Sequence, residues 1–120
     1  MQGQPMQGQP MQGQPMQSMQ HVQQSLSGYL HKTGKHGLRA AFQRRWCVLS
    51  DQTISYYKKE TDTRPKGQVC ITKGCPVAQS VQSSKPNTFY VEVSGRRWYF
   101  ACESEQSMNE WMQQVRLRSQ

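Results

Sequence analysis

Three side chains that can donate hydrogen bonds to an anion lie near the ends of short apolar stretches. Lys32 ends the first stretch, Arg45 lies near the start of the second, and Tyr56 lies near the end of the third. Hydrogen bonds to charged groups contribute roughly 1.5–3 kcal/mol each. Three or four of them would hold a multiply charged anion, provided that the fold brings these side chains together.

The stretches that carry these residues have the pattern of three consecutive β-strands. Residues 28–33 and 42–49 alternate apolar and polar side chains, and residues 53–58 are rich in β-branched and aromatic ones. The short polar step at 50–52 suits a tight hairpin between the second and third strands. Residues 34–41 contain two glycines and several basic or titratable side chains, which indicates a mobile basic loop.

Strand periodicity predicts where the three side chains point. Residues two apart share a face of a strand, so Lys32 lies on the same face as Leu30. In an up-down-up meander, the first strand ends where the second begins and where the third ends. Lys32, Arg45 and Tyr56 should therefore converge at the mouth of an apolar interior. The core-facing residues of these strands are Leu30, Cys47, Leu49 and Ile54.

Four more strands are expected in the second half of the chain. Lys66 precedes the first of them and lies at the mouth by the same meander argument. Ser94-Gly95 suits a tight turn between the last two strands, with Arg96 beside it. Spacing alone does not place this turn at the mouth. The meander argument follows the alternating directions of successive strands, and the corner at residues 74–76 interrupts that alternation. The expected strands are 68–72, 77–81, 88–93 and 97–102.

Residues 104–117 carry the one helical pattern. Ser104 suits an N-cap, and Arg116 and Arg118 in the last turn interact favourably with the helix dipole. Apolar residues recur at the i, i+3, i+4 and i+7 positions, so we expect one apolar stripe that covers an open end of two packed sheets. The stripe consists of Met108, Trp111, Met112 and Val115.

The N-terminal segment differs in composition from the rest. Residues 1–15 are three copies of Met-Gln-Gly-Gln-Pro, and the Gln, Gly and Pro content without aromatic residues is typical of disorder. We therefore expect a disordered low-complexity tail over residues 1–25 and one folded domain over residues 26–119. The tail is read either as an inert leader or as a linker or self-association segment.

Composition and motifs limit the function classes. Fifteen Lys and Arg against seven Asp and Glu give a formal net charge of +8, which favours anionic partners. No Gly-rich phosphate loop, nucleophile elbow or metal-ligand cluster is present, so we expect neither an enzyme nor a metal or other cofactor. The four cysteines lack CxxC spacing. No apolar run could cross a bilayer, so we expect any membrane contact to be peripheral. We also expect the protein to be cytoplasmic and monomeric.

In their order, these stretches resemble the pleckstrin homology (PH) domain family. GYLHKTG, a short basic loop, FQRRWCVL and a strand ending in SYYK are similar to the opening half of that fold. KPNTF at 85–89 resembles the entry to its sixth strand, WYFA at 98–101 its seventh strand, and Trp111 the tryptophan of its closing helix. The resemblance implies a mainly β protein with one C-terminal helix. Its seven strands would form a barrel or sandwich of two orthogonal antiparallel sheets, capped by that helix.

The resemblance also implies a set of headgroup-binding residues. In members that bind 3-phosphorylated phosphoinositides, a lysine ends strand one, a basic-x-Arg pair opens strand two, a tyrosine lies on strand three, and a basic residue follows the next loop. Gln43 departs from this pattern, because it stands where the first basic residue of the pair is expected. Loop cations could compensate for it. Arg44 faces outward and is left off the site. The expected ligand-binding residues are Lys32, Lys35, Arg39, Gln43, Arg45, Tyr56, Lys66 and Arg96.

These residues predict a phosphoinositide-binding module that is recruited from the cytoplasm to the plasma membrane or another phosphoinositide-rich membrane. The expected ligand is a 3-phosphorylated lipid such as phosphatidylinositol 3,4,5-trisphosphate or 3,4-bisphosphate. A second reading is a protein-interaction scaffold with weak or non-specific lipid binding. Nucleic-acid binding is not expected, since no RNP1-like aromatic motif or zinc finger accompanies the basic charge.

Overall fold

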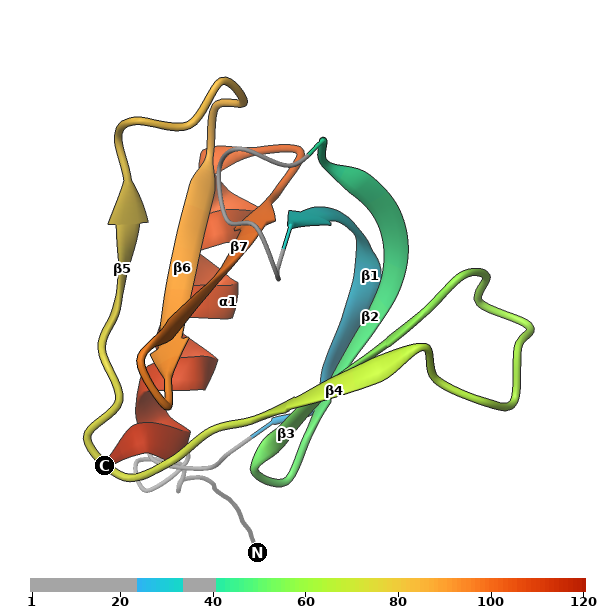
Figure 1. The fold of residues 1–120 in the computed structure, drawn as a ribbon, viewed down its shortest axis with the longest axis horizontal. Coiled ribbons are helices and arrows are strands. Elements are labelled where there is room, and N and C mark those ends of the chain that lie inside the picture. The colour runs from blue at the N-terminus through green and yellow to red at the C-terminus, as the bar shows by residue number, and fades with distance from the viewer. Residues whose placement is uncertain (1–23, 34–40) are drawn as a thin grey trace, which may run out of the picture.

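The computed structural model of the chain describes residues 24–33 and 41–120 (Figure 1). Seven antiparallel strands are followed by one C-terminal helix, as expected. The strand boundaries agree with the expected ones to within about two residues, and the expected tail lies almost wholly outside the described residues. The elements are β1 (Leu26–Thr33), β2 (Gln43–Ser50), β3 (Thr53–Tyr57), β4 (Gly67–Cys70), β5 (Val77–Ser80), β6 (Thr88–Val93), β7 (Arg96–Ala101) and α1 (Glu105–Ser119).

The strands form one hydrogen-bonded sheet in the order β4-β3-β2-β1-β7-β6-β5. The two expected sheets are therefore the two halves of a single bent sheet. Figure 1 shows β1 to β4 on one side and β5 to β7, backed by α1, on the other. The halves are joined by a short pairing at the end of β1, where His31 to Thr33 lie opposite Ala101 to Tyr99. This bend is what lets residues of β3 and β7 approach the end of β1.

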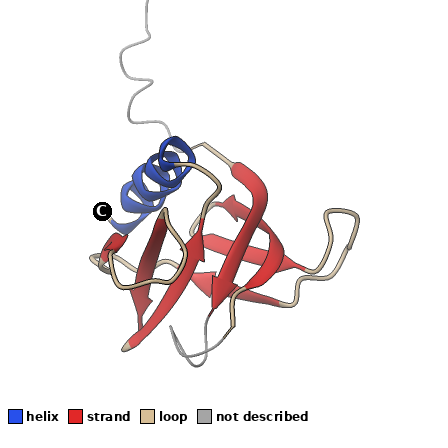
Figure 2. Cartoon of the chain, turned by 90° about the horizontal axis from the view of Figure 1, so that it is seen from above, coloured by secondary structure: helices blue, strands red, loops and turns tan. Residues whose placement is uncertain are grey.

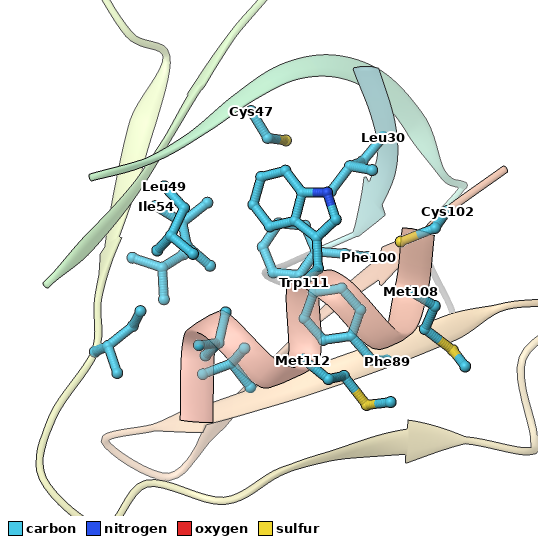
Figure 3. Close-up of a cluster of buried hydrophobic side chains, with 14 of the residues drawn as sticks. Leu30, Cys47, Leu49, Ile54, Phe89, Phe100, Cys102, Met108, Trp111 and Met112 are labelled. Carbon is cyan, nitrogen blue, oxygen red and sulfur yellow. The ribbon is translucent and has the colours of Figure 1, made fainter. Parts of the chain in front are cut away.

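The core lies between these halves, on the face that strand periodicity predicts. Leu30, Cys47, Leu49 and Ile54 are each at most 3% exposed, so the expected inward face of β1 to β3 is confirmed. The stacked rings of Phe89 and Phe100, 5.4 Å apart, supply the opposing surface from β6 and β7 (Figure 3).

Helix α1 completes the core. The side chain of Ser104 accepts a hydrogen bond from the amide of Ser107 at 3.0 Å, which confirms the N-cap. The four residues of the apolar stripe are buried, and Trp111 projects between the two halves of the sheet, close to Leu30 and Cys47 in Figure 3. In Figure 2 the helix lies along one flank of the strands.

The last turn of α1 has a role beyond the helix dipole. Arg118 is 3% exposed, and its guanidinium donates to the carbonyl oxygens of Asp51, Gln114 and Gln24. The side chain of Gln52 in turn donates to the carbonyl of Arg118 at 2.7 Å. This buried arginine therefore ties together the helix end, the β2–β3 turn and the chain entering β1.

Candidate functional site

Lys32 is the centre of the candidate site. It ends β1 on the core-facing side, and only 8% of its surface is exposed. Its Nζ lies 4.0 Å from the centroid of the Tyr56 ring and 5.4 Å from that of Trp98. Both rings present their negative faces to the ammonium group, which holds the charge at the rim of the core. The expected convergence of β1 and β3 on this point is confirmed.

The charge of Lys32 is poorly compensated. Burial is the main cause that lowers the pKa of its ammonium group, and the positive charges of Arg45 and Arg96 act in the same direction. The only ion pair among residues 24–33 and 41–120 joins Arg97 to Glu92, on the outer face of the β6–β7 hairpin. Within the described chain, the cations around Lys32 therefore lack an acidic partner, and an added anion would relieve their mutual repulsion.

Gln43 and Arg45 act as a unit on β2. Lys32 lies opposite Gln43 in the β1–β2 register. One guanidinium nitrogen of Arg45 donates to the Gln43 side-chain oxygen at 3.0 Å, and the other donates to the carbonyl of Arg44 at 2.9 Å. A cation at position 43 would repel Arg45, whereas the glutamine fixes its orientation. The departure from the family pattern thus gives Gln43 a positioning role.

Tyr56 is held against Lys32 by a close packing contact. Its hydroxyl end lies against Gly67 of β4, and a Cβ at that position would overlap with the phenol ring. Burial raises the pKa of the Tyr56 hydroxyl, so it stays protonated and able to donate at neutral pH. Gly67 is thereby the residue that lets the phenol reach the site.

Trp98 is the site residue that the sequence analysis missed. The guanidinium carbon of Arg96 lies 4.4 Å from the indole centroid, so one ring contacts both Arg96 and Lys32. The tight turn at Ser94 and Gly95, both with positive φ, brings this hairpin to the mouth. One signal was available: Arg96, Trp98 and the core residue Phe100 alternate along β7 and so share one face.

The other expected residues are placed differently or not described. Lys66 is exposed, and although its amide donates to the carbonyl of Tyr56 at 2.7 Å, its side chain lines a separate open cleft of about 500 Å³ with Lys58 and Arg64. Lys35 and Arg39 lie outside the described residues. The structure therefore gathers Lys32, Gln43, Arg45, Tyr56 and Arg96, together with Trp98; we call these six the Lys32 site.

Comparison with known protein families decides the classification. The family model described as "PH domain" matches residues 24–120, nearly the whole of the described chain. The chain belongs to the PH domain family. Family members are typically binding modules that lack enzymatic activity and commonly bind phosphoinositides, although some belong to larger enzymes. The family expectation from the sequence is confirmed.

Curated relatives are about a third identical to this PH domain over the residues that align with it. Human Sesquipedalian-1 is 34% identical over 89 residues, which are 72% of this chain and 34% of that protein. Src kinase-associated phosphoprotein 2 of Takifugu rubripes is 34% identical over 74% of this chain and 29% of its own length. Human Pleckstrin homology domain-containing family A member 2 is 30% identical over 74% of this chain and 22% of its own. The chain thus spans about a third or less of these relatives.

Solved structures confirm the fold of this PH domain. The PH domain of ArhGAP27 superposes with a TM-score of 0.67 at 19% identity, covering 81% of this chain and 100% of that one. The C-terminal PH domain of pleckstrin, solved in complex with D-myo-Ins(1,2,3,4,5)P5, gives a TM-score of 0.65 at 19% identity, covering 79% and 97%.

Two further properties of the described residues bear on the site. None of the helices there is both long and apolar enough to pass through a bilayer. Nor does the described part of the chain hold a group of three or more His, Cys, Asp or Glu side chains suited to a metal ion.

Proposed function

We propose that this PH domain binds the headgroup of a polyphosphorylated inositol lipid at the Lys32 site and so attaches the protein to a membrane surface. One observation carries the proposal. A nearly buried lysine, two arginines and a phenol from four strands meet at one mouth, with no carboxylate among the described residues to neutralise them. That arrangement complements a compact anion with several phosphates.

The side chains divide the task by their chemistry. Lys32 supplies a point charge at the bottom of the mouth, while Arg45 and Arg96 can donate paired hydrogen bonds to phosphate oxygens at its rim. Tyr56 adds a neutral donor, and Gln43 orients Arg45. Three hydrogen bonds to charged groups at roughly 1.5–3 kcal/mol each are enough for micromolar affinity after the cost of association.

The proposed ligand is a 3-phosphorylated phosphoinositide, and the proposed destination is the plasma membrane or another membrane rich in such lipids. The positions of Lys32, Arg45 and Tyr56 support this preference, since they match the family pattern for such ligands. The inositol pentakisphosphate bound to the related pleckstrin domain gives further support, because it presents similar clustered phosphates. Surface cations such as Lys58 and Lys59 would add about 1 kcal/mol each near an anionic leaflet, without selectivity.

The test compares two double variants with equal charge loss. Lys32→Gln/Arg45→Gln removes two cations of the Lys32 site. The control variant, Lys59→Gln/Lys73→Gln, removes two exposed lysines outside it. Each is titrated with a panel of soluble inositol phosphates, followed by chemical shift changes, and with vesicles that contain single phosphoinositides.

We expect the site variant to lose soluble headgroup binding by at least about a hundredfold, since two charged hydrogen bonds are removed. The control should bind the soluble ligands as the wild type does. Equal binding by wild type and site variant would refute the proposal and leave the protein-interaction scaffold as the better reading. Equal affinity for ligands with and without the 3-phosphate would refute only the lipid preference.

A further inference from the structure

Three aromatic side chains form a row across the outer face of β1, β2 and β3. Tyr29 lies opposite Trp46 in the β1–β2 register, and Trp46 lies opposite Tyr57 in the β2–β3 register. Residues that lie opposite each other in an antiparallel pair point to the same side of the sheet. The rings of Tyr29 and Trp46 pack edge-on, with their centroids 5.0 Å apart. We call these three residues the aromatic row.

The aromatic row is not part of the core. Its neighbours along the three strands, Leu30, Cys47 and Tyr56, face the core, so strand alternation directs the row to the other side. Helix α1 packs on the core side, and no helix of the described chain covers the row (Figure 1). All three side chains are partly exposed. Tyr and Trp are enriched at binding surfaces, because their large rings supply contact area at a small cost in conformational entropy.

The first ring of the row is held in place. The hydroxyl of Tyr29 accepts a hydrogen bond from the amide of Glu60 at 3.0 Å. The guanidinium carbon of Arg44 lies 3.7 Å from the centroid of the same ring, which is a stacking distance. A ligand of the row would therefore meet rings that are already ordered, and would lose little affinity in fixing them.

The N-terminal segment supplies a ligand of matching chemistry. The sequence Gln-Pro-Met occurs three times in it, at residues 4–6, 9–11 and 14–16. Proline restricts the residue before it to extended or polyproline II conformations, and polyproline II ligands bind surfaces lined with aromatic rings. Contacts between a methionine sulfur and an aromatic ring contribute roughly 0.3–1.5 kcal/mol. Each repeat thus carries two adjacent residues that suit aromatic rings.

Charge favours the aromatic row over the basic surfaces of the domain as the place for this segment. Residues 1–20 contain no Asp, Glu, Lys or Arg. The cations of the Lys32 site therefore offer them no ion pair, whereas contacts with aromatic rings need no charge.

The length of the chain allows the contact. Gln24 is fixed beside α1, because its amide donates to Gln114 and its carbonyl accepts from Arg118. From Gln24 to Tyr29 the chain covers about 17 Å, at about 3.3 Å per residue. The stretch from Met16 to Gln24 spans at most about 27 Å. The third Gln-Pro-Met can therefore turn back along β1 and reach the row, and the first two repeats have more length to do so.

We propose that the aromatic row binds the Gln-Pro-Met repeats of the same chain. A ligand attached by a short linker acts at an effective concentration in the millimolar range, so the row can be occupied even though a single repeat binds weakly. The three copies raise that concentration further. The proposal does not rest on the proposed function, because the aromatic row and Lys32 lie on opposite faces of the sheet.

The test uses the full chain and a variant of it, Pro5→Ala/Pro10→Ala/Pro15→Ala, which we call the proline variant. It changes no residue of the described domain. A synthetic peptide with the sequence of residues 1–16 is the probe, and the indole N–H resonance of Trp46 reports its binding. A second peptide, with alanine in place of the three prolines, is the control ligand.

Two tyrosine changes, each made in the proline variant, test the surface. Tyr57→Ser removes one ring of the aromatic row. Tyr90→Ser is the matched control, because Tyr90 is a partly exposed tyrosine on β6, in the other half of the sheet.

We expect the probe to bind the proline variant at least about threefold more tightly than it binds the wild type, because the attached repeats of the wild type compete for the row. The control peptide should bind at least about threefold more weakly than the probe. Tyr57→Ser should weaken probe binding about three- to tenfold, and Tyr90→Ser should leave it unchanged.

Three results would overturn the proposal. Equal affinity of the probe for the wild type and the proline variant would show that the attached repeats do not occupy the row. Equal binding by the two tyrosine variants would place the peptide elsewhere. A wild-type Trp46 resonance that moves with protein concentration would assign the row to the segment of a second copy. If Tyr57→Ser folds poorly, the comparison of wild type and proline variant still decides, since their domains are identical.

Discussion

A nearly buried lysine at the rim of a core costs stability unless something compensates its charge. The lowered pKa of the Lys32 ammonium group is a sign of this cost, because burial and two nearby arginines disfavour its charged form. Its aromatic contacts with Tyr56 and Trp98 offset only part of the cost. Residues that bind ligands are often held in such unfavourable environments, because the ligand supplies the missing partner.

Lys32→Met should therefore stabilise the unliganded protein, by about 0.5–1 kcal/mol at pH 7, while it weakens headgroup binding. With the folded-state pKa lowered below 10.5, the unfolded chain holds the lysine proton more tightly. The cost is thus fully present at neutral pH and falls as pH rises through the folded pKa towards 10.5. Denaturant unfolding of both proteins at pH 7 and at about pH 10 measures this difference, which should shrink at the higher pH.

Lys59→Met is the control for this prediction, because Lys59 is exposed and the same change there should alter stability by less than about 0.5 kcal/mol. A Lys32→Met variant less stable than the wild type would show that the aromatic contacts outweigh the desolvation of the ammonium group.

At the level of elements, the Lys32 site depends on how closely β3 and β4 approach each other. The phenol of Tyr56 occupies the space that a side chain on Gly67 would need. The two residues are paired in the β3–β4 register, so this contact fixes the position of the ring relative to β1. A glycine in a strand interior often marks such a close approach.

Gly67→Ala should displace the Tyr56 ring and lengthen its 4.0 Å contact with the Lys32 ammonium group. We expect headgroup affinity to fall about three- to tenfold, with a stability loss of about 1 kcal/mol. Calorimetric titration with a soluble inositol phosphate measures the affinity, and the Tyr56 ring resonances report the displacement.

Gly28→Ala is the matched control, because a Cβ at Gly28 would meet no atom within 4 Å. It should leave both the Tyr56 resonances and the affinity unchanged. If Gly67→Ala also leaves them unchanged, the tyrosine accommodates the methyl group and its position does not depend on Gly67.

On the scale of the whole molecule, Arg118 closes the domain at the end remote from the candidate site. Its guanidinium connects α1 to the β2–β3 turn and to Gln24, where the chain enters the domain. The amide of Gln24 also donates to the side chain of Gln114 on α1 at 2.9 Å. The start and the end of the domain are therefore joined through one buried cation.

Arg118→Met should destabilise the domain by about 2–3 kcal/mol, since it removes the hydrogen bonds that the Arg118 side chain donates to three part-buried carbonyl groups. Arg116→Met is the control: Arg116 is exposed and donates to one carbonyl, that of Val77, so its loss should cost less than about 1 kcal/mol. Thermal and denaturant unfolding distinguish the two. An equal loss of unfolding free energy in the two variants would mean that Arg118 stabilises the domain no more than an exposed arginine does.

The sequence by itself determined the strand and helix positions and the inward direction of Lys32, Cys47 and Tyr56. Both follow from local periodicity, because a strand alternates its faces whatever lies around it. It also determined that the ends of the first three strands meet, since short connections leave a meander little freedom.

Only the tertiary structure decided which distant groups share a site. It brought Trp98 to Lys32, directed the side chain of Lys66 into another cleft, and buried Arg118. It also placed Arg96 against Trp98, a position that the strand pattern left open and only the family resemblance suggested. It also placed Arg44, which the sequence analysis expected to face outward, beside Lys85 in the lining of one pocket. These arrangements depend on how the sheet bends and how its ends pack. No local pattern contains that information, because the bend arises from contacts between residues far apart in the chain.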